Sequence, residues 1–112
     1  KSLSAELLAA VGVSDPTNLV IGGLEDSQQF YQFAIEETGS LDAGALEKEV
    51  VIVAQNMVAA NPQIRAILLE CSLLPPYGVA VQDAVDLPVF DYITMINFVF
   101  EAVVKQQYSG FM

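Results

Sequence analysis

The chain has a single cysteine, Cys71, which follows the short apolar run 66–69 and precedes Ser72, Leu73 and a pair of prolines. A run of this length, bounded by prolines, predicts a buried strand of a parallel sheet that ends near Cys71. Ligands bind at this edge of open α/β sheets. Because a helix is expected from Pro76 or Tyr77, the thiolate would lie close to a helix N-terminus, which favours anions. Cys71 is therefore the main candidate for chemistry.

The two residues after the cysteine are the candidates for binding a substrate anion. The backbone N–H groups of Ser72 and Leu73 and the hydroxyl of Ser72 would suit a carboxylate if they face the cleft. Asp91 is interpreted as a helix N-cap rather than a proton carrier, and Tyr77 as either a pocket residue or a packing residue. For Cys71 itself the alternative is a small buried hydrophobic residue, which is common for free cysteines.

The sequence around Cys71 resembles a known family. Residues 69–77 read LECSLLPPY and residues 87–91 read LPVFD, and both resemble the C-terminal half of aspartate/glutamate racemase family proteins, within the Asp/Glu/hydantoin racemase superfamily. Weaker similarity extends through 9–13, 22–26 and 59–62. Ser72 replaces the threonine usual in the family.

The resemblance implies a cofactor-independent amino-acid racemase without a metal. In that family two pseudo-equivalent domains each supply one cysteine, so that one thiolate removes the α-proton and the other thiol returns a proton to the opposite face. Cys71 would be one catalytic residue, with Ser72 and Leu73 binding an amino-acid or dicarboxylate substrate. The second cysteine would belong to a missing N-terminal domain, and the isolated chain would be inactive.

Two alternatives stay open. The chain could be a noncatalytic α/β binding module in which Cys71 is structural. It could also have a related activity of the same superfamily, as a hydantoin racemase, a maleate isomerase or a decarboxylase.

Alternating helix and strand signals predict the elements that would position these residues. The expected order is helix 2–11, strand 19–21, a helix that begins at Asp26, helix 42–60, the strand before Cys71, helix 76–85, strand 88–90 and helix 92–107. This pattern predicts a single α/β domain over residues 1–112, with a three-layer, Rossmann-like (flavodoxin-like) parallel sheet covered by helices on both faces. The resemblance to the racemase family implies that this domain is one half of a pseudo-symmetric two-domain enzyme.

The composition narrows the possible partners and chemistry. A formal net charge of −10, with only 4 Lys and Arg, argues against nucleic acid and against an anionic membrane surface. With no histidine, a His-containing hydrolase triad and the common zinc sites cannot be assembled from this chain. One cysteine cannot form an internal disulfide and no secretion signal is seen, so a cytoplasmic location is expected.

The last predicted helix, 92–107, is apolar around most of its circumference. Its polar positions form one stripe, and the remaining surface is too large for one sheet face to cover. We therefore expect this helix to pack at an interface, and we expect a homo-oligomer.

Overall fold

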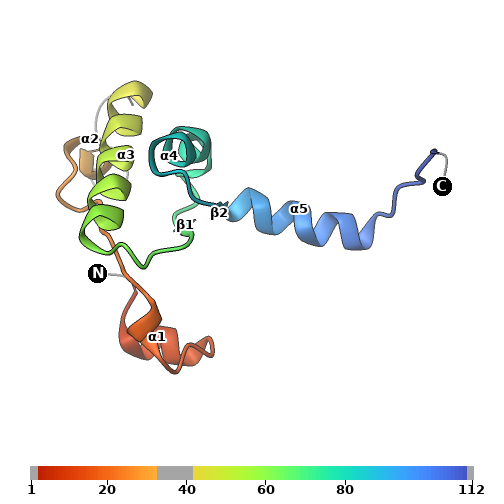
Figure 1. The fold of residues 1–112 in the computed structure, drawn as a ribbon, viewed down its shortest axis with the longest axis horizontal. Helices are drawn as coiled ribbons and strands as arrows, with labels where there is room; N and C mark the ends of the chain where they lie inside the picture. Colours follow the sequence, from red (N-terminus) through yellow and green to blue (C-terminus); the bar gives the residue numbers. More distant parts are fainter. Residues whose placement is uncertain (1–2, 33–41, 111–112) are drawn as a thin grey trace. The chain divides into compact units, whose positions relative to one another are not determined.

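The computed structural model describes residues 3–32 and 42–110, and its fold is drawn in Figure 1. The chain divides into two compact units, Lys1–Ile64 and Arg65–Met112. The expectation of a single domain over residues 1–112 stays a prediction.

In the first unit, helix α1 (Ala5–Ala10) has well-defined caps at both ends. The Leu7 N–H donates to Ser4 Oγ at 3.2 Å, which satisfies one of the free donors of the first turn. At the other end Gly12 has φ +90°, and the N–H of Val13 donates to the Leu8 carbonyl at 2.9 Å. This is a Schellman-type ending, which favours glycine because other residues are strained at positive φ. Gly12 thus ends the helix that the sequence predicts over residues 2–11.

The predicted strand 19–21 does not form. A short 3-10 helix, η1 (Pro16–Asn18), precedes it, and hydrogen bonds from the hydroxyl and the N–H of Thr17 lower the pKa of Asp15 at its start. Leu19 has extended dihedral angles, but residues 19–21 pair with no strand among the described residues, and Ile21 is 56% exposed. A strand is stable only when its backbone N–H and C=O groups pair with those of a neighbouring strand. Three apolar residues in a row do not by themselves provide that neighbouring strand.

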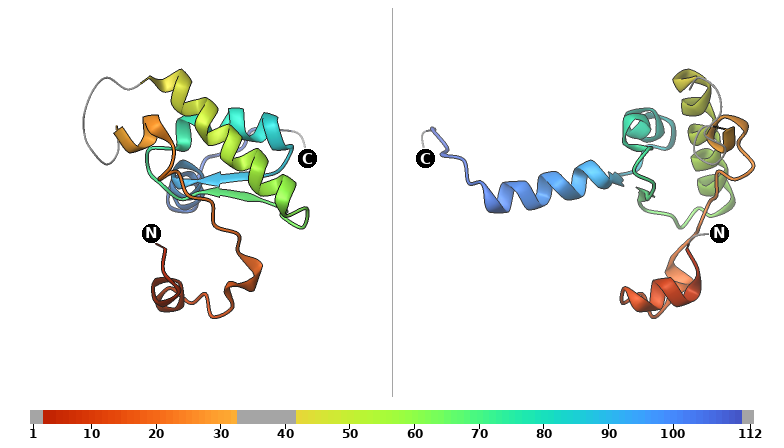
Figure 2. Two further views of the ribbon diagram at one scale, coloured as in Figure 1. Left: turned by 90° about the vertical axis from the view of Figure 1, so that its left-hand side faces the viewer. Right: turned by 180° about the vertical axis from the view of Figure 1, so that it is seen from behind.

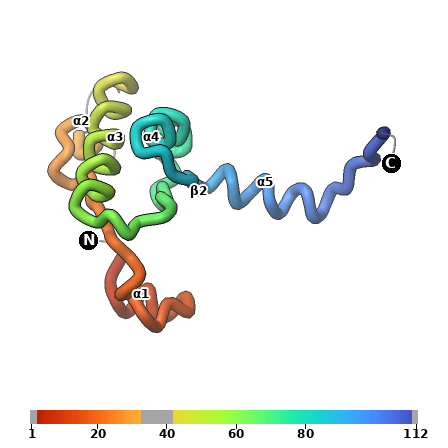
Figure 3. Tube along the Cα trace, in the orientation of Figure 1, coloured from red at the N-terminus to blue at the C-terminus, as the bar shows by residue number. Residues whose placement is uncertain are grey.

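Helix α2 (Gln28–Phe30) is capped by a residue distant in sequence. The Glu49 carboxylate accepts hydrogen bonds from the N–H of Gln29 at 3.1 and 3.2 Å and from the N–H of Phe30 at 3.3 Å. The helix predicted to begin at Asp26 therefore begins two residues later, and its first donors are satisfied by Glu49. Figure 3 shows α2 beside the helix that carries Glu49. Phe33 and Ala34, which the sequence also suggests as members of this helix, lie outside the described residues.

The long helix α3 (Ala43–Ala60) confirms the helix that the sequence predicts over residues 42–60. Asp42 Oδ1 accepts from the Ala45 N–H at 3.0 Å, and Asn61 ends the helix by donating from its side-chain amide to the Met57 carbonyl at 3.0 Å. The buried stripe, spaced by four residues, consists of Leu46, Val50 and Ala54.

The second unit is built on a strand–helix–strand crossover. Strands β1 (Ile67–Leu69) and β2 (Val89–Asp91) pair in parallel, with Ile67 opposite Val89 and Leu69 opposite Asp91; Figure 2 shows them side by side in its left-hand view. Between them lie η3 (Pro75–Tyr77) and helix α4 (Gly78–Val85). The core of this unit consists of Ile67, Leu69, Leu74, Tyr77 and Val81.

The predicted fold class is wrong. The structure is mostly helical, and its described residues contain a single sheet of only two parallel strands. A three-layer, flavodoxin-like sheet with helices on both faces needs more strands than one crossover unit provides. The local strand signals around Cys71 are confirmed, whereas the sheet inferred from them is not.

The last helix, α5 (Tyr92–Val103), ends earlier than the predicted residue 107 and has no buried residue. Its exposed apolar side chains include Phe98 and Val103, each 77% exposed. The packing of α5 at an interface stays a prediction.

No described helix is both long and apolar enough to cross a membrane.

A glycine substitution tests the structure of α4. Gly78 has helical dihedral angles, and a β-carbon there would meet its nearest neighbour, Asp91 Oδ2, at an ordinary 3.4 Å. Gly78→Ala should therefore raise the free energy of unfolding by roughly 0.5 to 1 kcal/mol. The matched change Gly12→Ala should lower it by about 1 kcal/mol because of the positive φ. Urea unfolding followed by circular dichroism measures both, and equal effects of the two changes would contradict the assigned backbone.

Candidate active site

Cys71 lies two residues beyond β1, at the carboxyl end of the parallel pair, as the sequence predicts. The thiol is free and half-buried. It is thus reachable by a small molecule while being partly shielded from water. Among the described residues, no group of three His, Cys, Asp or Glu side chains could hold a metal ion.

A tight turn follows the cysteine directly. The Cys71 carbonyl accepts the Leu74 N–H at 3.0 Å, so Ser72 and Leu73 are the two central residues of a β-turn. Their N–H groups donate to no partner among the described residues. The turn therefore presents two free donors next to the thiol, which is an arrangement that suits an anion.

The helix N-terminus contributes less than the sequence suggested. Pro75 and Pro76 have no N–H to offer, and the Tyr77 N–H is used by the Leu74 carbonyl at 3.0 Å. The Gly78 N–H in turn donates to the Pro75 carbonyl. The donors available near Cys71 are consequently those of the turn, not those of the helix.

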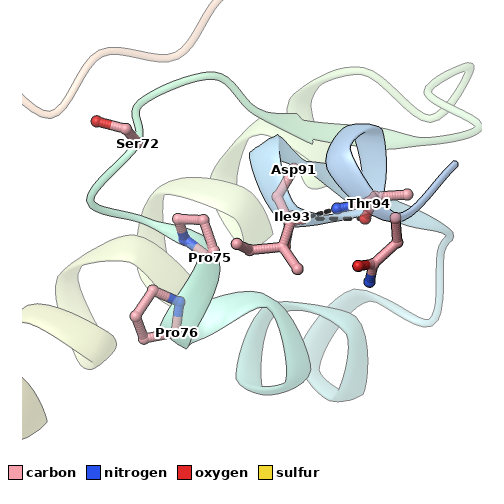
Figure 4. Close-up of a pocket in the computed structure, with 7 residues that line it drawn as sticks. Ser72, Pro75, Pro76, Asp91, Ile93 and Thr94 are labelled. Atoms are coloured by element: carbon pink, nitrogen blue, oxygen red, sulfur yellow. Dashed lines mark hydrogen bonds between the residues drawn. The ribbon is translucent and has the colours of Figure 1, made fainter. Parts of the chain in front are cut away.

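A shallow cavity of about 520 Å³, widely open to solvent, lies beside this turn (Figure 4). Its lining residues are Ser72, Pro75, Pro76, Asp91, Ile93, Thr94 and Asn97. Of the predicted site residues, only Ser72 reaches it, and its hydroxyl points away from Asp91 and Thr94 in Figure 4. Cys71 and Leu73 are not among the residues that line the cavity.

Asp91 caps α5, as the sequence predicts, and also lines the cavity. Its Oδ1 accepts the Thr94 N–H at 2.8 Å and the Thr94 hydroxyl at 3.0 Å. Its Oδ2 accepts no hydrogen bond from the described residues and lies 3.4 Å from the position of a β-carbon on Gly78. The cap was predicted from the sequence, but the place of Asp91 in the wall of the cavity was not. A sequence signal did exist, since the two predicted strands would bring the residues at their carboxyl ends to the same edge.

Comparison with known proteins identifies relatives that are lyases by name. Dimethylsulfoniopropionate lyase 5 of Emiliania huxleyi (strain CCMP1516) is 35% identical over 100 residues, 87% of this chain and 19% of the relative. Lyase 3 of the same strain is 43% identical over 88 residues, 74% of this chain and 22% of the relative. The dimethylsulfoniopropionate lyase of Durusdinium sp. clade D is 34% identical over 96 residues, 86% of this chain and 31% of the relative.

The chain thus spans about a fifth to a third of the length of the curated relatives it matches. No family model matches the chain, and no solved structure matches it significantly.

These relatives overturn the functional prediction. They are named as lyases, so the assignment to the aspartate/glutamate racemase family, and with it an isomerase that acts on amino acids or dicarboxylates, is wrong. The alternatives of a noncatalytic binding module, a hydantoin racemase, a maleate isomerase or a decarboxylase do not match these names either. The partners predicted with the racemase, including a missing N-terminal domain and a homo-oligomer, are not supported.

Proposed function

We propose that this chain carries part of the active site of a lyase that acts on dimethylsulfoniopropionate. The observation that supports the proposal is the 34 to 43% identity to lyases of that name over 74 to 87% of the chain. Because the match covers at most about a third of each relative, the proposal concerns the part of the site that these residues supply.

The chemistry of this substrate defines what such a site must do. A sulfonium group and a carboxylate are joined by two methylene groups. A base removes a proton from the carbon next to the carboxylate, the electron pair forms a carbon–carbon double bond, and the carbon–sulfur bond breaks with its electrons leaving on sulfur. The products are acrylate, dimethyl sulfide and the protonated base. The sulfonium is already a good leaving group, so the elimination needs a base and charge stabilisation.

In our proposal the base is the Cys71 thiolate. The acidic C–H belongs to the carbon that is bonded to the carboxylate, so the base and the carboxylate-binding groups must lie next to each other. The turn after β1 has this arrangement, because the N–H groups of Ser72 and Leu73 directly follow the cysteine and donate to no other described residue. The thiol is half-buried, which keeps part of its surroundings free of water.

The same N–H groups would serve two purposes. They bind the substrate carboxylate in the ground state, and they stabilise the extra negative charge that moves onto it as the proton leaves. The Ser72 hydroxyl can add a third donor after rotation about its Cα–Cβ bond, because the hydroxyl is not involved in any hydrogen bond among the described residues.

A segment exchange tests the proposal. The segment of Emiliania huxleyi lyase 3 that matches this chain is replaced by the corresponding residues of this chain, and dimethyl sulfide release is followed by headspace gas chromatography. We expect the exchanged lyase to retain at least about a tenth of its activity, because the corresponding residues should place the catalytic groups correctly. A misplacement of about 1 Å would lower the activity by about a hundredfold.

The control for this experiment exchanges the same segment for one with scrambled order. A soluble, folded exchanged lyase with no more activity than the scrambled control would contradict the proposed function.

A further inference from the structure

The cavity beside the turn has the composition of a site for a methylated cation. Its walls combine the apolar Pro75, Pro76 and Ile93 with one charged side chain, Asp91, and three uncharged polar side chains, those of Ser72, Thr94 and Asn97. A sulfonium carries methyl groups and a positive charge but no N–H donors, so apolar contact and a counter-charge are what it requires of a site. We propose that this cavity binds the dimethylsulfonium end of the substrate, with Asp91 Oδ2 as the counter-charge, an inference that rests on the proposed function.

The two oxygens of Asp91 have separate tasks in this arrangement. Oδ1 accepts from the N–H and the hydroxyl of Thr94, which fixes the carboxylate and satisfies the start of α5. Oδ2 accepts no hydrogen bond among the described residues, so its charge is available to a ligand. Within the part of the chain that the structure describes, no cationic side chain lines the cavity to compete for that charge. The carboxylate is therefore held in place without being neutralised.

The position of Asp91 relative to Cys71 suits a substrate with a charge at each end. Asp91 pairs with Leu69, the last residue of β1, and Cys71 follows Leu69 by two residues along the chain. An extended continuation of β1 past Leu69, with a rise of about 3.3 Å per residue and a strand spacing of about 4.8 Å, would place the α-carbons of Asp91 and Cys71 roughly 8 Å apart. This distance leaves room for a short chain whose carboxylate binds at the turn and whose sulfonium binds in the cavity.

The inference predicts recognition of charge in addition to shape. Two unreactive probes separate these factors. Both have a carboxylate, but 3-(trimethylammonio)propionate has a methylated cationic end and 4,4-dimethylpentanoate has an uncharged tert-butyl end of the same shape. They are called the cationic and the neutral probe after this end of the molecule. NMR titration of this protein should show that the cationic probe binds more tightly than the neutral one. Asp91→Asn, which keeps a side-chain oxygen for capping, should lower the affinity for the cationic probe by about five- to tenfold, while the affinity for the neutral probe changes less than twofold.

A matched control removes the same charge elsewhere in the same unit. Asp86 is exposed, lies outside the cavity and has φ +53°, a conformation that asparagine accepts. Asp86→Asn should leave both affinities unchanged, which separates a local counter-charge from the effect of net charge. Equal binding of the two probes by the unmodified protein, or equal effects of Asp91→Asn and Asp86→Asn, would overturn the inference. Since these probes are not turned over, this outcome is independent of the activity of the exchanged lyase.

Discussion

Cys71→Ser is expected to lower dimethyl sulfide release by the segment-exchanged lyase by about a hundredfold to ten-thousandfold, the range that a positioned general base contributes. Serine has nearly the same shape as cysteine, so the β-turn from Cys71 to Leu74 should persist. Its hydroxyl is a much weaker acid than a thiol and does not form an anion that could remove the substrate proton. The measurement is the initial rate at saturating substrate, by headspace gas chromatography.

Binding provides the control for this variant. The affinity for 3-(trimethylammonio)propionate should change less than twofold in Cys71→Ser, because the turn and the cavity that would hold the two ends of the probe remain. Ser72→Ala should instead weaken the binding of this probe. The binding free energy should become less favourable by about 1 to 3 kcal/mol if the Ser72 hydroxyl contacts the carboxylate. A Cys71→Ser enzyme that keeps more than a tenth of the activity would remove the thiol from the proton transfer.

The racemase prediction and the proposed elimination share their first chemical step. Racemisation of an amino acid and elimination from dimethylsulfoniopropionate both begin with the loss of a proton from the carbon beside a carboxylate. A thiol followed by two free N–H groups, as at Cys71, Ser72 and Leu73, would suit that first step in either reaction. The later steps of the two reactions depend on the leaving group and on residues elsewhere, and the nine residues around the cysteine carry no information about these.

The parts of the fold that the sequence predicts well depend on neighbouring residues. Helix α3 is fixed by its Asp42 cap, its buried stripe and the Asn61 ending, all of which are local features. The position of Cys71 after β1 and the cap at Asp91 are predicted for the same reason. Apolar periodicity and capping residues are sufficient in these cases.

The parts that were missed depend on contacts between distant segments. The donors at the start of α2 are satisfied by Glu49, twenty residues from Gln29, and no local pattern indicates that contact. The cavity combines Ser72 and Pro75 with residues that follow β2, so it exists only because β1 and β2 pair. The segment 19–21 has strand-like residues without a partner strand among the described residues, which propensity alone cannot reveal.

The stability of the first unit should depend most strongly on the buried stripe of α3. Leu46 is only 1% exposed, so Leu46→Ala removes buried methyl and methylene groups and leaves a cavity. The expected loss is about 2 to 5 kcal/mol of unfolding free energy, which is a large fraction of the roughly 5 to 15 kcal/mol typical of a small protein. Ile52 on the same helix is 54% exposed, and Ile52→Ala should cost less than about 1 kcal/mol because most of its side chain already contacts water. Urea unfolding followed by circular dichroism compares the two variants directly. If they prove equally stable, Leu46 does not belong to the core of this protein, and the orientation assigned to α3 would have to be rotated.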